Sequence, residues 1–564
     1  MTLFSPLTLT ALLDRSIREF ADLQAIGYAA ETYMTYREFG DQVHGCSEVL
    51  RSRGVSPGDR VAIIGESSPN WGVAYFAITT MGCVAVPVLP DFHPSEMHHI
   101  LRHSECSAVF VSERSAMKLD DLDRSPFNAF ILIDTLSLIE EKDSTTSLKQ
   151  LIANGSRELR KIRAVAMQFV GLRSSTVKED DIAAIIYTSG TTGHSKGVML
   201  THKNIVWNAQ QSADIPPMVR GDRLLSTLPL AHVYECTLGL ILPIMTGASI
   251  SYLRKPPTAT VMLPALQAVR PTTMLVVPLI IEKIYKTKIL PEIRKKFVGR
   301  MLVGIPYFRK KFHGIAGKKL MEMFGGSLKF FGIGGSALAP DVELFLKEAR
   351  FPYAIGYGMT ETSPLIAGSP PRIQRYRTTG LIVPGLEVKI ENPDPVSGVG
   401  EVIVRGPSVM KGYYKDPVRT AEVLRPDGWL HTGDLGVFDE VRHLALRGRL
   451  KNVILGPSGE NIYPEAIESI INRAAYVLES LVYQEGGSLV ARIFLDYESL
   501  DSDAASSGET ESMTREHINK ILDELKESVN LQVSGFSKLS RVIEQREPFE
   551  KTPTLKIKRY LYTS

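Results

Sequence analysis

Tyr187-Thr-Ser-Gly-Thr-Thr-Gly-His-Ser-Lys-Gly197 is the most informative segment of this chain of 564 residues. It follows a short apolar run, IAAII, that is typical of a buried strand, and a helix is expected to begin soon after it, near Thr201. Glycine-rich turns let several backbone N–H groups converge on one phosphate, and hydroxyls and a lysine add further donors. The side chains and glycines of this kind are Thr188, Ser189, Gly190, Thr191, Thr192, Gly193 and Lys196. The segment therefore predicts a phosphate-binding loop and not a flexible linker.

Two common nucleotide-binding motifs fit the sequence less well. The Walker A pattern GxxxxGK[ST] has no match, because Ser195 precedes Lys196, and a conventional P-loop NTPase is disfavoured. Gly332–Ala337 fits GxGxxA, but the acidic residue that a dinucleotide fold needs about 20 positions later is missing. We interpret Gly332–Ala337 as a tight turn lining a nucleotide or acyl pocket.

Short apolar runs alternate with amphipathic stretches over most of the chain. The expected strands are Arg60–Glu66, Cys83–Pro87, Ala108–Ser112, Ile182–Thr188, Arg223–Leu228 and Thr273–Pro278, and the expected helices include Tyr36–Arg53 and Pro94–Ser104. Such alternation predicts an α/β fold with mainly parallel sheets. The apolar stretch Val73–Pro90 is interrupted by Gly82 and Pro87, so it predicts a buried helix and strand and not a membrane span.

The pattern changes after about residue 380. Leu386–Glu391, Glu401–Arg405 and the residues near Leu444 predict a small barrel-like β region. A smaller α+β unit follows, with helices expected at Pro464–Arg473 and Thr514–Val529, strands around Leu481 and Ala491, and a surface loop at Leu500–Ser512. We therefore expect a large multi-layer N-terminal domain, residues 1–448, and a small mobile C-terminal domain, residues 449–564.

Three further stretches place reactive side chains at turns. Gly356-Tyr-Gly-Met-Thr-Glu361 offers an aromatic face, a hydroxyl and a carboxylate, and Gly428-Trp-Leu-His-Thr-Gly-Asp434 ends on a carboxylate suited to ribose hydroxyls. Thr552-Pro-Thr-Leu-Lys-Ile-Lys-Arg559 carries lysines that could reach a reacting phosphate. Each stretch alone is more often an ordinary surface turn, so their value lies in their combination and order.

In this order the stretches resemble the adenylate-forming superfamily of acyl-CoA synthetases, peptide-synthetase adenylation domains and beetle luciferases. The likeness runs along nearly the whole chain through RVAIIGE, YTSGTTGHSKG, LPLAHVYE, GGSAL, GYGMTET, GWLHTGDLG, RGRLKNVIL and TPTLKIKR. LPLAHVYE, LKNVILGPSGENIYPEAIE and TPTLKIKR are closest to long-chain fatty acid–CoA ligases. Ser195 departs from the usual proline, Leu555 from a frequent glycine, and the Phe-Asp-x-Ser stretch of amino-acid-activating domains is absent around His232.

The resemblance implies a role for each matching residue. The loop would hold the β- and γ-phosphates of ATP, Glu361 and Thr188 would bind Mg²⁺, and Lys556 would bridge the carboxylate and the α-phosphate. Asp434 and Arg449 would hold the ribose, and Lys451 is the hinge position. The remaining nucleotide contacts would come from Gly335, Ser336, Ala337, Tyr357, Gly358, Met359, Thr360 and Gly459, and the acyl contacts from His232, Tyr234, Gly334 and Gly356. His232 could equally be an ordinary core histidine.

The implied reaction forms an acyl-adenylate with release of pyrophosphate and then transfers the acyl group to coenzyme A. Alternatives are transfer to an acyl carrier protein, arrest at the acyl-adenylate, and, from another class, a catalytically inactive lipid-binding adaptor. Chain length and saturation of the substrate and the oligomeric state stay open.

Composition limits which partners and which cellular location we expect. Four cysteines without a CxxC pair and an N-terminus without a basic leader fit a reducing cytoplasm. A net charge of +3 gives no reason to expect nucleic acid. The basic stretch Lys283–Lys319 holds twelve Lys or Arg residues with aromatic residues between them. It predicts a solvated face or, alternatively, a surface for peripheral membrane association.

Overall fold

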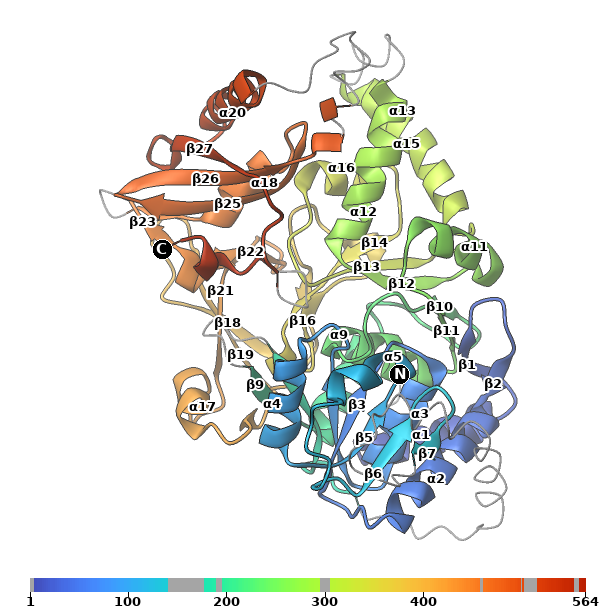
Figure 1. The fold of residues 1–564 in the computed structure, drawn as a ribbon. Coiled ribbons are helices and arrows are strands. Elements are labelled where there is room, and N and C mark those ends of the chain that lie inside the picture. The colour runs from blue at the N-terminus through green and yellow to red at the C-terminus, as the bar shows by residue number, and fades with distance from the viewer. Residues whose placement is uncertain are drawn as a thin grey trace. The chain divides into compact units, whose positions relative to one another are not determined.

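The computed structural model describes residues 5–139, 177–188, 195–294, 305–456, 460–498, 500–501, 515–551 and 557–563 (Figure 1). The chain forms two compact units. The first comprises Met1–Ala337, Phe345–Glu387 and Val404–Leu430, and the second comprises Leu338–Leu344, Val388–Ile403 and His431–Ser564. The expected domain boundary at residues 448 and 449 falls inside the second unit, and it stays a prediction about where the chain hinges.

An eight-stranded sheet of the first unit has the order β20-β9-β8-β4-β3-β5-β6-β7. Its strands are β3 (Arg60–Ile64), β4 (Val84–Val88), β5 (Cys106–Val111), β6 (Ala129–Leu132), β7 (Ser137–Ile139), β8 (Ile182–Thr188), β9 (Lys196–Thr201) and β20 (Gly412–Tyr413). The central strands are parallel, whereas β7, β9 and β20 pair antiparallel with their neighbours. This confirms the expected α/β class with mainly parallel strands.

A seven-stranded sheet of the same unit has the order β14-β13-β12-β10-β11-β1-β2. Its strands are β1 (Gln24–Tyr28), β2 (Tyr33–Thr35), β10 (Arg223–Leu225), β11 (Ser249–Tyr252), β12 (Thr273–Val276), β13 (Phe330–Ile333) and β14 (Tyr353–Ile355). All pairs except β1 with β2 are parallel. The carboxyl ends of these parallel strands therefore meet at one edge of the sheet, where α/β folds bind ligands.

Helix α3 (Pro69–Thr80) explains the apolar stretch that begins at Val73. It contacts β3 and β4 of one sheet and β1 of the other, and nearly all its residues are buried. A helix enclosed in this way is apolar all round, so it lacks a polar face. Within the described parts of the chain, no helix is both long and apolar enough to cross a membrane.

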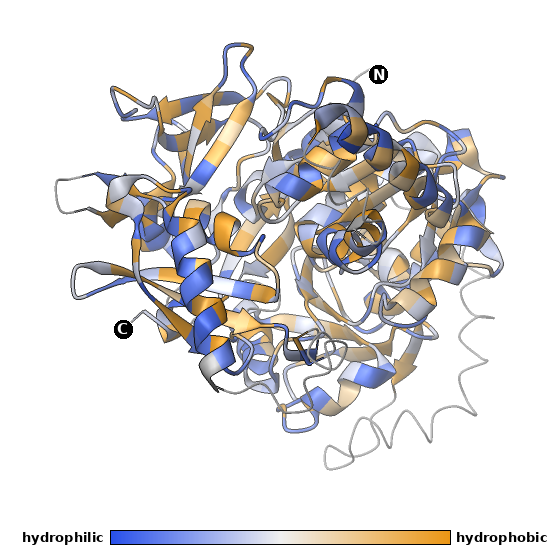
Figure 2. Ribbon diagram, turned by 90° about the horizontal axis from the view of Figure 1, so that it is seen from above, coloured by the Kyte–Doolittle hydropathy of each residue, from blue (hydrophilic) through white to orange (hydrophobic). Residues whose placement is uncertain are grey.

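The other helices of the first unit range from α10 (Leu242–Thr246), whose residues are all buried, to α17 (Pro417–Val423), which has no buried residue. Figure 2 shows the hydrophobic strands and the mixed hydropathy of many of these helices. The other helices are α1 (Leu9–Phe20), α2 (Tyr36–Ser52), α4 (Pro94–Ser104), α5 (Glu113–Ala116), α8 (His202–Ser212), α9 (Val233–Glu235), α10 (Leu242–Thr246), α11 (Ala259–Val269), α12 (Pro278–Ile284), α13 (Leu290–Arg294), α15 (Pro306–Met323) and α17 (Pro417–Val423). Thr35 and Glu38 form a capping box at the start of α2, which fixes its first residue.

Among its described residues the second unit contains three sheets, the smallest of which pairs β23 (Ile454–Leu455) with β24 (Asn461–Ile462). At the place of the expected barrel-like region lies a sheet of order β18-β19-β21-β22, formed by Glu387–Glu391, Gly400–Arg405, Leu430–Phe438 and Leu444–Arg449. A second sheet contains β25 (Val477–Glu485), β26 (Ser488–Leu495) and β27 (Leu539–Gln545), with helices α18 (Pro464–Ile471) and α20 (Arg515–Asn530).

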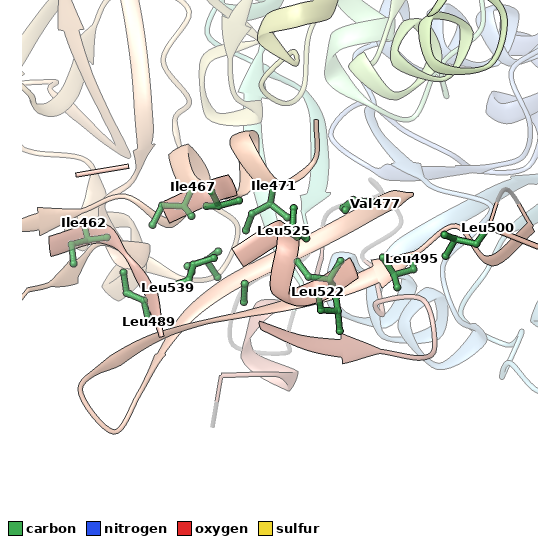
Figure 3. Packing of buried hydrophobic residues seen from close by; sticks show 14 residues of the cluster. Ile462, Ile467, Ile471, Val477, Leu489, Leu495, Leu500, Leu522, Leu525 and Leu539 are labelled. Carbon is green, nitrogen blue, oxygen red and sulfur yellow. The ribbon is translucent and has the colours of Figure 1, made fainter. Parts of the chain in front are cut away.

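The core of this second sheet follows from the period of a strand. Val482 belongs to one buried cluster with Ile467 and Ile471 of α18 and Leu522 and Leu525 of α20, and Figure 3 labels these four helix residues. Its neighbours in β25, Leu481 and Tyr483, belong to a separate cluster with Phe549. Successive side chains of a strand point to opposite faces, so both faces of this sheet are covered. The expected loop Leu500–Ser512 lies almost entirely outside the described residues.

Candidate active site

The first unit brings Lys196 and Glu361 together across 165 positions of sequence. Lys196 Nζ donates to Glu361 Oε1 at 2.8 Å and to Tyr413 Oη at 2.6 Å, and Tyr413 Oη donates to the same Glu361 oxygen at 2.8 Å. The Lys196 ammonium also lies 4.3 Å from the centre of the Tyr413 ring. A cation, a carboxylate and a hydroxyl thus meet at the end of the glycine-rich segment.

Burial and charge act in opposite directions on this cluster. The side chain of Glu361 is 6% exposed, and that of Lys196 is 27% exposed. Burial alone would raise the pKa of Glu361, but the charge of Lys196 and the hydrogen bonds from Lys196 and Tyr413 outweigh it and lower the pKa. Burial and the nearby Glu361 both raise the pKa of Tyr413. Glu361 is therefore a carboxylate, able to accept a metal ion or a further donor.

Strand pairing sets the position of these groups. Thr188 at the end of β8 lies opposite Lys196 at the start of β9, and Tyr413 of β20 lies opposite Val198. The glycine-rich segment thus joins two antiparallel strands, and helix α8 begins only after β9, capped by Thr201. The expected helix start near Thr201 is confirmed, but β9 lies between that helix and the loop.

Thr188, opposite Lys196 in the strand pairing, carries a hydroxyl at the end of β8. Its Oγ1 is buried and has no hydrogen-bond partner among the residues that the structure describes. A buried hydroxyl without a partner is costly, so it marks a position where a ligand or ion would satisfy it. With the carboxylate of Glu361, this hydroxyl is an oxygen donor of the kind Mg²⁺ prefers.

The described residues contain no group of three or more His, Cys, Asp or Glu side chains placed to hold a metal by themselves. Mg²⁺ usually binds to one or two protein oxygens together with waters and the phosphates of the substrate. The Glu361 carboxylate and the unsatisfied Thr188 hydroxyl fit that kind of site.

Two residues of this site were not predicted from sequence. Tyr413 bonds both members of the ion pair, and Asn208 is fully buried and holds the segment after Glu361. Asn208 Nδ2 donates to the carbonyls of Thr362 and Leu365, and Asn208 Oδ1 accepts from the Leu365 N–H. The aromatic pair in Lys411-Gly-Tyr-Tyr-Lys415 was the available signal for Tyr413, whereas nothing local marks Asn208.

The predicted acyl residues meet at the carboxyl edge of the seven-stranded sheet. Gly334 follows β13 and Gly356 follows β14, and the Gly356 N–H donates to Ile333 at 2.9 Å. The Tyr234 ring packs against Gly334, where an added Cβ would lie 3.2 Å from Cε1. His232 caps the short helix α9, its Nδ1 accepting from the Tyr234 N–H at 3.2 Å. Four of the predicted substrate contacts therefore share one edge.

The predicted nucleotide contacts that follow these strands differ in exposure. Gly335, Ser336, Ala337 and Gly358 are exposed, Met359 is half-buried, and Tyr357 and Thr360 are buried. Gly358 tolerates no side chain, because a Cβ would lie 1.9 Å from the Pro364 carbonyl oxygen. These residues follow β13 and β14, at the same edge of the sheet as Gly334 and Gly356.

The second unit holds the predicted ribose contacts together. Asp434 of β21 lies opposite Arg449 of β22, and Arg449 Nε is 2.8 Å from Asp434 Oδ1. The exposed Lys451 follows in a 3₁₀ turn, Leu450–Asn452. The pairing of Asp434 with Arg449 needs only neighbouring strands, so the sequence pattern of the two strands is enough to bring them together.

Several predicted residues fall outside the described part of the chain. They are Ser189, Gly190, Thr191, Thr192, Gly193, Gly459 and Lys556. The residues on either side of 552–556 are described, and Lys551 and Ile557 form a β-bridge. Arg559 donates to both oxygens of Glu468, at 3.0 and 2.6 Å. These contacts tie the C-terminal segment to helix α18.

Glu235, next to the predicted acyl contact Tyr234, is a buried carboxyl that sequence analysis did not single out. It is fully buried, and Gly239 packs against it so closely that a Cβ there would lie 2.6 Å from the carboxyl. Burial raises the pKa of Glu235 to about 8, although the hydrogen bond with Ser226 lowers it. The folded protein therefore keeps this carboxyl protonated at neutral pH.

This protonation predicts a pH-dependent stability. The pKa of Glu235 is about 8 in the folded chain and near its ordinary value of 4.5 in the unfolded chain. The protonated carboxyl therefore contributes fully to the free energy of unfolding below pH 4.5, and this contribution is lost as the pH rises towards 8. Glu235→Gln should remove this pH-dependent loss of folding stability, which is on the order of a few kcal/mol. Melting temperatures at pH 5 to 9 should diverge increasingly from wild type, whereas exposed Glu440→Gln should follow wild type. A wild-type-to-Gln gap independent of pH would contradict this.

Comparison with known proteins finds relatives along nearly the whole chain. A family model described as AMP-binding enzyme matches residues 13–414. The chain is 31% identical over 98% of its length to long chain acyl-CoA synthetase 6, peroxisomal, of Arabidopsis thaliana, covering 84% of that protein. It is 29% identical over 84% of its length to long-chain-fatty-acid–CoA ligase 1 of Cavia porcellus, covering 71% of it.

Solved structures agree in fold. ATP-bound MatB from Rhodopseudomonas palustris matches with a TM-score of 0.76 at 22% identity, over 98% of both chains. A benzoate CoA ligase from Burkholderia xenovorans matches with a TM-score of 0.75 at 20% identity, over the whole of both chains. The two-unit architecture is thus shared across the full length.

Proposed function

This chain belongs to the AMP-binding enzyme family, and we propose that within it the chain is an ATP-dependent long-chain fatty acid–CoA ligase. The proposal rests on one observation above all: its full-length likeness to proteins named long-chain acyl-CoA synthetases. In the first half-reaction a fatty acid carboxylate attacks the α-phosphate of ATP, forming an acyl–phosphate bond and releasing pyrophosphate. In the second, the thiol of coenzyme A attacks the acyl carbon, and AMP leaves.

The first half-reaction needs charge neutralisation, because a carboxylate approaches a polyanion. Lys196 supplies a cation beside the phosphate loop, and Glu361 with Thr188 would hold Mg²⁺. A Mg²⁺ ion held by Glu361 and Thr188 would supply charge neutralisation at the phosphates. The glycines and hydroxyls that follow Thr188 would fix the β- and γ-phosphates by backbone and side-chain donors. The acyl group would lie at the sheet edge by Tyr234 and Gly334.

The second unit would serve both half-reactions. Asp434 and Arg449 would hold the ribose hydroxyls, and Lys556 would approach the α-phosphate in the first step only. Lys451 would be the hinge about which the C-terminal part, residues 449–564, turns to admit coenzyme A. These roles come from the family pattern, and the Asp434–Arg449 pair is compatible with them.

Product analysis tests the proposal. With ATP and oleate, pyrophosphate and AMP should form, and acyl-CoA should accumulate only when coenzyme A is added. Parallel reactions with an acyl carrier protein in place of coenzyme A separate the ligase from a carrier-protein synthetase. Acyl-adenylate without transfer to either thiol would indicate an acyl-AMP ligase. ADP and phosphate as main products, or no turnover with a panel of fatty acids, would contradict the proposal.

Peripheral membrane association would bring the enzyme to its substrate. On α15, Tyr307, Lys311, Ile315 and Lys318 are exposed and spaced three or four residues apart, so apolar and basic side chains share one face. Tyr307 is 71% exposed. Such a face suits the anionic surface of a membrane, at about 1 kcal/mol per basic residue. The enzyme would then work at the inner surface of the cytoplasmic membrane.

Charge reversal tests this surface. Lys311→Glu with Lys318→Glu should weaken sedimentation with anionic vesicles by about tenfold or more, since each cation contributes about 1 kcal/mol. The matched control is Lys520→Glu with Lys538→Glu, two exposed lysines of the second unit. High salt, near 1 M, should also release the wild type because the Debye length falls to about 3 Å. Binding unaffected by both salt and the α15 changes would disprove the surface.

A further inference from the structure

The buried carboxyl of Glu235 lies one residue from the predicted acyl contact Tyr234. Ser226 Oγ donates to Glu235 Oε1 at 2.5 Å, and Glu235 Oε2 has no hydrogen-bond partner within the described ranges of the chain. A buried polar atom without a partner costs stability, so an apolar side chain of similar size would serve packing alone better. The presence of a carboxyl at this position therefore needs an explanation other than packing.

Glu235 ends helix α9 at the point where the backbone changes its hydrogen-bond pattern. Residues Val233–Glu235 are α-helical, and Cys236–Ile241 form a π-helix. Short π-helical segments next to α-helices are frequently found at functional sites. Gly239 leaves space for the Glu235 side chain, since a Cβ on Gly239 would lie 2.6 Å from the carboxyl carbon. The helix thus encloses its own carboxyl, and the Ser226 hydroxyl bonds to that carboxyl from outside the helix.

Helix α9 is attached at two places to the carboxyl edge of the seven-stranded sheet. Ser226 follows β10, and its N–H donates to the Ser251 carbonyl of β11 at 2.9 Å. Gly334 follows β13, and the Tyr234 ring packs against it. Glu235 therefore joins α9 to the end of β10, and Tyr234 joins α9 to the end of β13. These two strands are separated in the sheet by β12 alone.

We propose that Glu235 is a positioning residue for the acyl site, because its bond with Ser226 holds α9 so that Tyr234 stays against Gly334. The inference rests on the proposed function, which puts the acyl group at this edge of the sheet. Tyr234 is half-buried, so part of its ring remains available to a ligand. Without the Ser226 bond, α9 loses this link to β10, and the acyl chain meets a less fixed aromatic wall. Glu235 itself does not touch the substrate, and it affects binding of the fatty acid and not of ATP.

Direct binding tests this role without turnover. Oleate is titrated calorimetrically into the full chain, and a non-hydrolysable ATP analogue is titrated separately. Glu235→Leu and Ser226→Ala should each weaken oleate binding by about fivefold to tenfold, as expected for one hydrogen bond, and should leave binding of the analogue unchanged. Glu235→Gln keeps an oxygen that can accept from Ser226, so its oleate affinity should stay within about twofold of wild type.

The matched control is Ser47→Ala, which removes another buried serine hydroxyl of the same unit. Ser47 Oγ donates to the carbonyls of Val43 and Ala77, both at 3.0 Å, between α2 and α3. Its melting temperature should fall about as far as that of Ser226→Ala, whereas its oleate affinity should equal that of wild type. Glu235→Leu combined with Ser226→Ala should bind oleate no more weakly than the weaker single variant, because both changes remove the same bond.

Weaker oleate binding in Glu235→Leu and Ser226→Ala, with wild-type binding in Ser47→Ala, supports the positioning role. Equal losses in Ser47→Ala, equal losses for the ATP analogue, additive losses in the double variant, or no oleate binding to the wild type overturn it. If oleate binds as described but no fatty acid supports pyrophosphate release, the positioning role stands and the proposed ligase function fails. In turnover, the same two variants should raise the KM for oleate and leave kcat within a few-fold of wild type.

Discussion

Glu361→Gln should slow fatty-acid-dependent pyrophosphate release by on the order of 10²–10³-fold, the usual cost of losing one preorganised charged group. The substitution removes the carboxylate that pairs with Lys196 at 2.8 Å and that would bind Mg²⁺. An amide of the same shape keeps the hydrogen-bonding positions. The loss of rate therefore measures the effect of the charge more than that of packing. The measurement is initial rate against Mg²⁺ and ATP concentration with oleate as substrate.

Tyr413→Phe is the matched control for the same oxygen. It removes the hydroxyl that donates to Glu361 and accepts from Lys196, but leaves the Lys196–Glu361 ion pair intact. The hydrogen bond to the charged Glu361 is worth about 1.5 kcal/mol, so we expect a loss of about tenfold. Thermal melting of both variants excludes general unfolding. Equal losses in the two variants, or a Glu361→Gln rate within a few-fold of wild type, would show that the carboxylate charge is not needed.

Local sequence patterns were enough to predict much of the fold. Strand Ile182–Thr188 and helix Pro94–Ser104 have the bounds that the sequence predicted. The strand is a continuous apolar run, and the helix begins at a proline and ends before a residue in the left-handed conformation. Hydrophobic periodicity and the residues that begin or end a helix act within a few positions, so a single sequence reveals them.

Long-range contacts set the limit of prediction at the site. Tyr413 bonds Lys196 across 217 positions, and Asn208 bonds Leu365 across 157. Neither contact can be predicted from composition or from the spacing of residues in the sequence. Strand β9 was missed because it lies so close to the glycines that it resembled the end of the loop. Glu235 was missed because its neighbours decide its burial and protonation.

The C-terminal segment holds a choice that the sequence leaves open. Two lysines two residues apart, Lys556 and Lys558, compete for the role at the α-phosphate. The Lys558 ammonium is 3.5 Å from Glu550, and its N–H donates to the Glu550 carbonyl at 2.9 Å. Lys558 therefore has a structural task at the base of the loop that the Lys551–Ile557 bridge closes. The choice of Lys556 as the reactive lysine stays a prediction, because residues 552–556 lie outside the described part of the chain.

Lys556→Ala should nearly abolish fatty-acid-dependent pyrophosphate release, by on the order of 10²–10³-fold or about 3–4 kcal/mol, since the cation matters while charge develops on the α-phosphate. Synthetic acyl-adenylate with coenzyme A should still give thioester at close to the wild-type rate, because the second step needs no cation at that phosphate. Lys558→Ala is the matched control and should change both half-reactions by no more than a few-fold. Loss of adenylation in Lys558→Ala alone would assign the role to Lys558. Equal loss of both half-reactions in Lys556→Ala would mean that the C-terminal part does not exchange roles between the two steps.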